Sequence, residues 1–347
     1  MLEAQTKWNS KIQMVRGVAI LFVVAFHFLN GPSIWGIYGV NLFFCTSGYL
    51  ITGILLRDIK ENGKIHFKKF ALKRVRRLMP AASVTILFIM FLNFVGIFTG
   101  NRRDYIVSGT AYLIYIGNLV GLLPHDHHTT ALAFGHLWTL SAEMQFYFLW
   151  STIFINTLRK VTRRSRILIT ALLIILGIPL LQFALRSVTE TIVTNTIDCL
   201  GSFLIGTFLY LIFESQFENT NNFFRATVAI VGGFSLLCIA LQYHNEWVVR
   251  RGFFSIALSL LIASSFFLFL GSRERPWQRP LRHVGDISYS LYLIHYPVYL
   301  AFGEYSDSIL NRILALGSSF ILAECSYKFI EKRFWHPSNV MRAASGI

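Results

Sequence analysis

The chain has 347 residues, of which 54% are hydrophobic and only 14% are charged, and its formal net charge is +15. Because a soluble domain carries about 25% charged residues, this composition excludes an ordinary soluble protein and indicates an integral membrane protein. The basic residues gather in short runs between apolar segments, at 68–77, 159–166 and 273–282. That pattern is typical of cytoplasmic loops and argues against a nucleic-acid-binding protein.

Ten apolar segments approach the length of about 20 residues that a membrane crossing needs. They cover 12–30, 37–56, 80–99, 137–156, 166–186, 194–213, 225–242, 252–271, 285–303 and 309–330. An eleventh segment, 105–122, would place the basic loop 157–166 outside if it also crossed. We therefore expect an all-α polytopic bundle of about ten transmembrane helices, with 105–122 re-entrant or interfacial and both termini cytoplasmic. The whole chain, 1–347, is expected to form a single membrane domain.

The first span contains Arg16 and His27, whose separation of eleven positions puts both on one helix face, about 16 Å apart along the axis. A charge in the bilayer costs at least ~2.5–3.5 kcal/mol, so polar residues here suggest function. Arg16 alone fits a snorkelling anchor, and His27 alone fits a packing histidine. Since burial disfavours a charged imidazole, His27 can also accept a proton as a general base does.

The next polar group is the basic run 68–80, after which Pro80 is expected to begin a span. Arg74 and Arg77 are three positions apart and share a helix face. A cytoplasmic loop explains their charge. Guanidinium groups also match the geometry of phosphate oxygens, so a phosphate-binding site at the membrane surface explains these residues equally well. Lys73 and Arg76 would add positive charge to that site.

In the span 137–156, Glu143 lies seven positions after His136, so the two share a helix face. A glutamate in an apolar segment is costly, and we expect it to orient a histidine or hold a proton. Trp138 and Tyr147 alone would be interfacial or packing aromatics.

A later span, 285–303, contains Ser288, Tyr289 and His295. Pro297 is expected to kink this helix. Packing alone is a strong alternative for these polar residues.

No metal site is expected. The sequence PHDHH at 124–128 resembles a set of metal ligands, but it lies in a loop without thiolates or an HExxH motif, which indicates a solvated loop. The four cysteines have neither metal-ligand nor disulfide spacing.

Six motifs between residues 16 and 334, taken together, resemble the membrane acyltransferase-3 family. They are the pair Arg16 and His27, GVNLFFCTSGY at 39–49, the set Phe70, Arg74, Arg77 and Pro80, HLWTLSAEMQFY at 136–147, GDISYSLYLIHYP at 285–297, and SYKFIEKRF at 326–334. The chain departs from the family pattern at Met144, where many members carry a second acid.

The resemblance implies an O-acyltransferase of the bacterial inner membrane. Its donor would be acyl-CoA on the cytoplasmic side, most often acetyl-CoA. Its acceptor would be a sugar hydroxyl of a surface polysaccharide or lipid-linked oligosaccharide on the outer side, such as the O-antigen of lipopolysaccharide. The chain resembles stand-alone members that lack an extracytoplasmic esterase-like domain. The alternatives are a proton-coupled transporter or flippase, or an acyltransferase acting on a lipid or small-molecule glycoside.

The resemblance also suggests roles for the polar residues. Arg74 and Arg77, with Lys73 and Arg76, would bind the phosphates of coenzyme A, and Arg16 would assist. His27 would be the base, with Glu143 and His136 tuning it or relaying protons. The candidates for substrate binding or an acyl relay are Ser288, Tyr289, His295, Trp138 and Tyr147.

Overall fold

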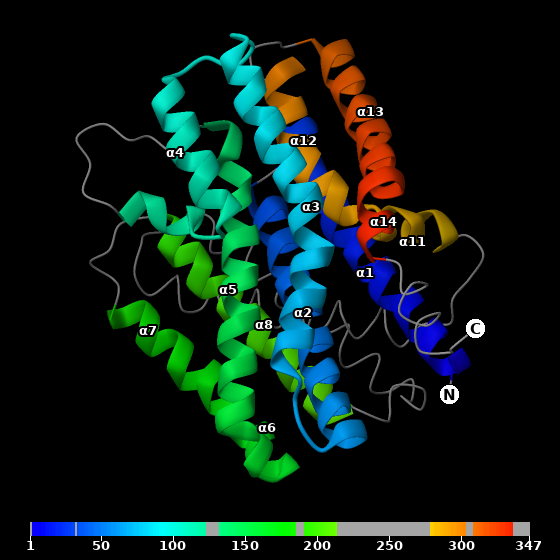
Figure 1. Ribbon diagram of the computed structural model, residues 1–347, viewed down its shortest axis with the longest axis vertical. Helices are drawn as coiled ribbons and strands as arrows, with labels where there is room; N and C mark the ends of the chain where they lie inside the picture. Colours follow the sequence, from blue (N-terminus) through cyan, green and yellow to red (C-terminus); the bar gives the residue numbers. More distant parts are fainter. Residues whose placement is uncertain are drawn as a thin grey trace. The chain divides into compact units, whose positions relative to one another are not determined.

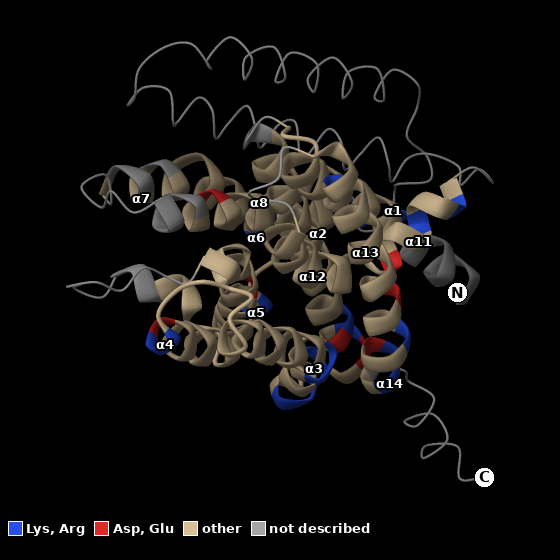
Figure 2. Ribbon diagram, turned by 90° about the horizontal axis from the view of Figure 1, so that it is seen from above, with Lys and Arg blue, Asp and Glu red and all other residues tan. Residues whose placement is uncertain are grey.

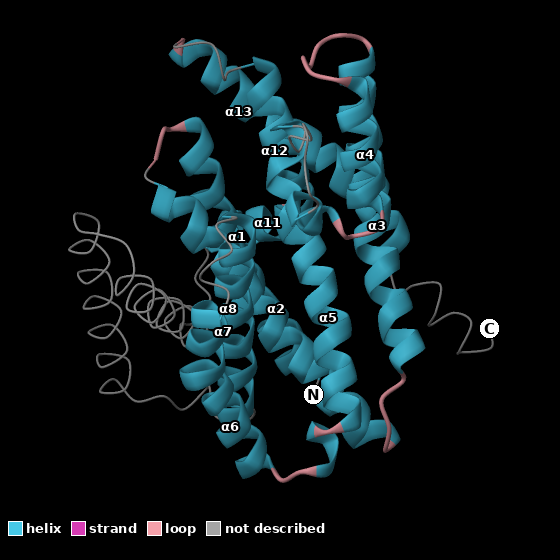
Figure 3. Cartoon of the chain, turned by 90° about the vertical axis from the view of Figure 1, so that its left-hand side faces the viewer, coloured by secondary structure: helices cyan, strands magenta, loops and turns pink. Residues whose placement is uncertain are grey.

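A computed structural model describes residues 2–31, 33–122, 132–184, 191–213, 278–302 and 308–335. Within these ranges the chain is helical and contains no β-strand, as Figures 1 and 3 show. The predicted spans 225–242 and 252–271 and the PHDHH sequence lie outside the described residues, as does the first half of the basic run 273–282.

Four described helices are long and apolar enough to cross a membrane, over Lys11–Phe28, Trp35–Asn62, Phe67–Phe94 and Ile309–Phe334. The all-helical class is therefore confirmed for the described residues, and these four candidate membrane helices overlap four of the predicted spans. The total of ten spans and the cytoplasmic position of both termini stay predictions. The segment 105–122 is divided into α4, Arg102–Leu113, and a 3-10 helix, Gly117–Leu122. With 12 residues, α4 is about 18 Å long, too short for a crossing.

The basic run before Pro80 is helical, so a loop over these residues is wrong, while the point at which the span begins stays a prediction. The helix α3 runs from Phe67 to Phe94 and includes both the basic run and Pro80. A proline inside a helix removes only its own hydrogen-bond donor, and membrane helices tolerate that loss. Arg74 and Arg77 are thus helical residues and not loop residues.

The chain forms two compact units, each described here by itself. Unit 1 contains α1 (Leu2–Phe28) up to Phe26, α2 (Ser33–Asn62), α5 (Trp138–Asn156) from Glu143 onward, and α6 (Arg163–Leu172). It also contains a π-helical segment (Leu173–Gly177), α7 (Ile178–Ala184), α8 (Thr191–Phe213) and α11 (Arg279–Asp286).

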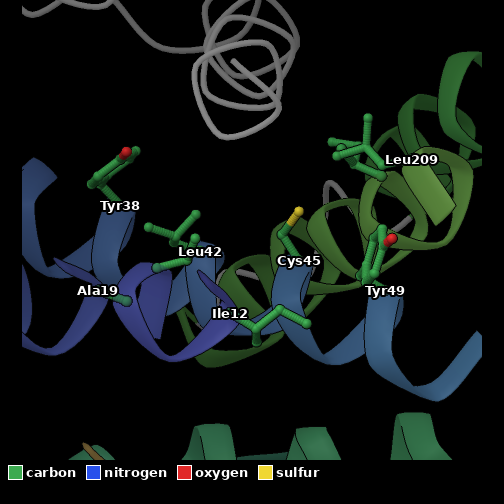
Figure 4. Packing of buried hydrophobic residues seen from close by; sticks show 9 residues of the cluster. Ile12, Ala19, Tyr38, Leu42, Cys45, Tyr49 and Leu209 are labelled. Carbon is green, nitrogen blue, oxygen red and sulfur yellow. The ribbon is translucent and has the colours of Figure 1, made fainter. Parts of the chain in front are cut away.

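The core of unit 1 lies where α2 and α8 pack closely together. Ile12, Ala19, Leu42, Cys45 and Leu209 are among its buried residues (Figure 4). Gly48 and Gly206 allow the close approach, because a β-carbon at either position would clash with a backbone carbonyl oxygen of the facing helix, that of Phe203 or Cys45. Small residues serve the same purpose in many membrane helix pairs.

Unit 2 contains residues 27–29, α3, α4, the first residues of α5, α12 (Ser288–Phe302) and α13 (Ile309–Ser326). A π-helical turn, Tyr327–Glu331, continues α13 into α14 (Lys332–Trp335). The helices α12 and α13 lie side by side, and α3 contacts α12, α14 and the π-helical turn (Figure 1). Unit 2 therefore joins the basic start of α3 to the polar residues of α12.

Candidate active site

Three histidines from distant motifs come together in unit 2. His27 lies in the last turn of α1, His136 in a 3-10 helix (Leu132–Leu137) just before α5, and His295 in the middle of α12. The ring centroid of His295 is 5.2 Å from that of His27 and 5.5 Å from that of His136. His136 and His295 are buried, whereas His27 is half-buried. We call these three residues the histidine cluster.

Backbone carbonyls fix the tautomer of His295. Its Nδ1 is 2.7 Å from the carbonyl oxygen of Tyr292 and 3.1 Å from that of Leu291. Because carbonyl oxygens only accept hydrogen bonds, Nδ1 carries the proton. The other nitrogen, Nε2, is buried and has no hydrogen-bond partner among the described residues. It is therefore a bare acceptor inside the cluster.

His136 is held in the opposite tautomer. Its Nε2 lies 3.1 Å from the carbonyl oxygen of Leu293, so Nε2 carries the proton. Its Nδ1 is buried without a hydrogen-bond partner in the described part of the chain. Pro297 makes this contact possible, because the backbone N–H that would normally bond to the Leu293 carbonyl is missing at a proline four residues later.

Tyr292 also ties the 3-10 helix to α12. Its hydroxyl donates to the carbonyl oxygen of His136 at 2.8 Å and lies 2.6 Å from Oγ1 of Thr139. Tyr292 and its neighbours Tyr296 and Tyr299 are not among the site residues predicted from the sequence. The available signal was their spacing of four and three residues, which places all three on the helix face next to His295.

Glu143 has a serine and a tyrosine as partners in unit 1. Its Oε1 accepts a hydrogen bond of 2.5 Å from the hydroxyl of Ser47 and another from the hydroxyl of Tyr147. The Tyr147 hydroxyl also lies 3.0 Å from Oγ of Ser47. Ser47 belongs to the SGY part of the second motif, and the sequence analysis did not select it. A proton-relay role for Glu143 stays a prediction.

The predicted donor-binding arginines differ in their surroundings. Arg74 and Arg77 are half-buried on α3, whereas Lys73 and Arg76 are exposed. The guanidinium of Arg74 lies over the ring of Phe70, and that of Arg16, in unit 1, over the ring of Phe43. Figure 2 shows further basic residues on α14, a helix that contacts α3.

The remaining candidates have clear structural contacts. The hydroxyl of Tyr289 donates to the carbonyl oxygen of Leu78 at 2.6 Å, which ties α12 to α3. Ser288 is fully buried, and Trp138 is half-buried at the start of α5. The described residues contain no group of three or more His, Cys, Asp or Glu side chains placed to hold a metal ion.

A second buried polar cluster joins the last two motifs. Ser290 on α12 donates to the carboxylate of Glu331, and its Oγ lies 2.8 Å from Oγ of Ser326. Glu331 is 5% exposed, at the end of the π-helical turn. Glu331 belongs to the last of the six motifs and is not among the site residues predicted from the sequence.

Known proteins that are similar to this chain are named as O-acetyltransferases. Peptidoglycan O-acetyltransferase OatA of Listeria monocytogenes is 27% identical over 94% of this chain and 55% of its own length. Putative peptidoglycan O-acetyltransferase YrhL of Bacillus subtilis is 30% identical over 92% of this chain and 53% of its own length. A putative O-acetyltransferase of Staphylococcus aureus is 26% identical, over 94% and 58% respectively.

The chain spans just over half the length of these curated relatives. No solved structure matches it significantly. The family profile described as an acyltransferase domain matches residues 9–324, which is nearly the whole chain. This protein therefore belongs to the acyltransferase-3 family.

Proposed function

We propose that the chain is a membrane enzyme that transfers an acyl group, in the first instance acetyl, from acyl-CoA to a sugar hydroxyl of a bacterial cell-surface polymer. Family membership and the names of the relatives support acyl transfer over the transporter alternative. Two relatives are named for peptidoglycan, which makes that polymer the first candidate acceptor, ahead of O-antigen. We place the enzyme in the cytoplasmic membrane.

The histidine cluster is the observation that carries the proposal. Transfer to a hydroxyl needs a group that removes the hydroxyl proton as the oxygen attacks the thioester. His27 is half-buried beside two imidazoles whose bare nitrogens are acceptors. A hydroxyl that enters this cluster can donate to the bare nitrogens of His136 and His295, since their protonated ring nitrogens are bonded to backbone carbonyls.

In the proposed reaction His27 takes the proton from the acceptor hydroxyl. The oxygen attacks the thioester carbonyl, the C–S bond breaks, and the proton passes to the leaving thiolate. The products are the O-acyl sugar and free coenzyme A. The bare nitrogens of His136 and His295 accept hydrogen bonds from neighbouring hydroxyls of the sugar and so orient it. Arg74 and Arg77 bind the donor phosphates.

The test uses the purified full-length chain in detergent with acetyl-CoA and the disaccharide of N-acetylglucosamine and N-acetylmuramic acid. Release of coenzyme A and the mass of the sugar are both measured. We expect His27→Ala to lower kcat by about 10²–10⁴-fold, the usual contribution of acid–base catalysis. His283→Ala, a change of an exposed histidine on α11, is the matched control and should leave the rate unchanged.

Two outcomes would contradict the proposal. A His27→Ala protein that acetylates the sugar at the wild-type rate would exclude His27 as the base. A wild-type protein that transfers no acyl group to this disaccharide, to O-antigen sugars or to lipids would exclude the function. Mass spectrometry of peptidoglycan and lipopolysaccharide from cells with and without the chain identifies the polymer.

A further inference from the structure

One face of α12 is lined by tyrosines that contact the histidine cluster. Tyr292, Tyr296 and Tyr299 are separated by four and three residues, so they follow one side of the helix. The ring of Tyr296 is 4.9 Å from that of His27 and 5.2 Å from that of His136, measured between centroids. The ring of Tyr299 is 5.8 Å from that of His27.

The three tyrosines are not equivalent. The hydroxyl of Tyr292 is bonded to the His136 backbone and to Thr139, so this residue has a structural role. The rings of Tyr296 and Tyr299 are nearly parallel, with planes 23° apart and centroids 6.3 Å apart. Both side chains are half-buried, whereas His295 in the same helix is fully buried. Each tyrosine therefore keeps some exposed surface and has its ring near the proposed base.

We propose that Tyr296 and Tyr299 form the binding surface for the sugar ring of the acyl acceptor. This inference rests on the proposed function and identifies the acceptor side of that site. Aromatic faces are electron-rich, so they attract the partly positive C–H groups on the face of a pyranose. Binding sites of this kind combine aromatic walls with a few polar groups that fix orientation, which the histidine nitrogens provide.

The position along α12 separates this surface from the donor site. Tyr289, at the start of α12, is bonded to Leu78, one residue after Arg77 on α3. Tyr299 lies ten residues further on, about 15 Å along the helix axis. The proposed phosphate-binding end therefore lies near the start of α12, and the tyrosine surface covers its second half, beginning directly after His295. A sugar on the tyrosines and a thioester from the α3 end would meet at the histidine cluster.

Kinetics of the purified full-length chain test this assignment, with acetyl-CoA as donor and the N-acetylglucosamine–N-acetylmuramic acid disaccharide as acceptor. We expect Tyr296→Leu and Tyr299→Leu each to raise KM for the disaccharide about tenfold, because the stacking surface is lost. KM for acetyl-CoA should stay at the wild-type value. Tyr296→Phe and Tyr299→Phe keep the ring and should stay within about threefold of wild type.

The matched control is Phe91→Leu, which removes an aromatic ring that is 54% exposed on α3 and should change neither KM. Unchanged KM for the disaccharide in both leucine variants would overturn the inference. So would an equal rise of both KM values, which would indicate that the rings only hold the helices together. A wild-type chain without transferase activity would refute the proposed function itself, whatever the variants do.

Discussion

At position 297 a proline removes one hydrogen-bond donor from α12, and His136 uses the acceptor that becomes free. The carbonyl oxygen of Leu293 would otherwise bond to the backbone N–H of residue 297. Instead it accepts from Nε2 of His136 at 3.1 Å and so fixes the tautomer that leaves Nδ1 bare. The expected kink at Pro297 is thus the lesser consequence of this residue.

We predict that Pro297→Ala lowers kcat by about 2–10-fold. The new backbone N–H at position 297 competes with His136 for the carbonyl oxygen of Leu293. The size of the effect follows from the loss of one hydrogen bond, which contributes about 0.5–1.5 kcal/mol. The measurement is the acetylation rate of purified protein. Pro179→Ala, in the first turn of α7, is the control. If Pro297 acts through His136, adding Pro297→Ala to His136→Ala has no further effect. Additive losses would refute this coupling.

At Glu143 a substitution can remove the charge of the side chain and keep its hydrogen-bond acceptor. Glutamine keeps an oxygen that can accept from Ser47 or Tyr147 but carries no charge. If Glu143 transfers a proton, as we propose, Glu143→Gln retains the thermal stability of the protein and lowers acetylation by about 10²-fold, because the amide cannot take up a proton. Glu143→Ala should also lower stability, by about 1–3 kcal/mol, since two hydroxyls lose their acceptor.

Tyr147→Phe removes one of the two donors and leaves the carboxylate, so its effect on stability measures that hydrogen bond alone. Thermal unfolding in detergent and acetylation rates are measured on the same preparations. A fully active Glu143→Gln protein would reduce Glu143 to a hydrogen-bond acceptor between α2 and α5.

Among the helices, the end of α13 shows how a π-helical turn creates a polar contact. Ser326 and Glu331 are five residues apart, which in an α-helix puts their side chains about 140° apart. The π-helical turn Tyr327–Glu331 has wider turns, and both side chains reach Ser290 on α12. The turn therefore links α13 to the helix that carries His295.

We predict a coupling free energy of about 1.5–3 kcal/mol between Ser290 and Glu331, because the bond is buried and involves a carboxylate. A double-mutant cycle with Ser290→Ala and Glu331→Gln, measured by thermal unfolding, gives this value. The ion pair of Lys328 and Glu324, 3.0 Å apart on the surface of the same helix, is the control and should give about 0–0.5 kcal/mol. Equal couplings would contradict the prediction.

The extents of the helices could be predicted only in part from the sequence. Apolar length located α1, α2 and α13, because a membrane span needs a fixed number of apolar residues. The helical start of α3 was missed because Lys and Arg lower hydropathy without opposing helix formation. The π-helical turns leave no pattern in a single sequence. The packing of Gly48 against α8 also depends on a partner that hydropathy cannot identify.

At the scale of the whole molecule, the residues of the candidate site could also be predicted only in part from the sequence. The cost of polar groups in a bilayer selected His27, His136, His295 and Glu143 from the sequence. It could not select their partners, since Ser47 and Tyr147 look like ordinary residues of apolar helices. Which histidines meet depends on contacts across more than 250 residues of chain, between His27 and His295. The spacing of residues along one helix does not show which residues of another helix they contact.

The net charge of +15 leads to a further prediction, because part of that charge lies on α3 and α14 of unit 2, where we propose that a polyanionic donor binds. Arg74 and Arg77 are half-buried on α3, and α14, with the exposed Lys332 and Arg333, packs against the same helix. S-Acetylpantetheine carries the same thioester as acetyl-CoA but none of its phosphates. If these cations hold the phosphates, the wild-type protein prefers acetyl-CoA, and added salt reduces the preference by screening.

We predict that Arg77→Ala raises KM for acetyl-CoA by about 10–100-fold, the loss of a charge-assisted bond, and leaves KM for S-acetylpantetheine unchanged. Initial rates with both donors at low and high salt provide the measurement. Arg159→Ala, which removes an exposed charge from the 3-10 helix Leu158–Lys160, should alter neither constant. Equal losses with both donors would mean that Arg77 supports the fold or the thioester and does not bind phosphate. A preference that high salt leaves intact would point to recognition of the nucleotide base instead of its charge.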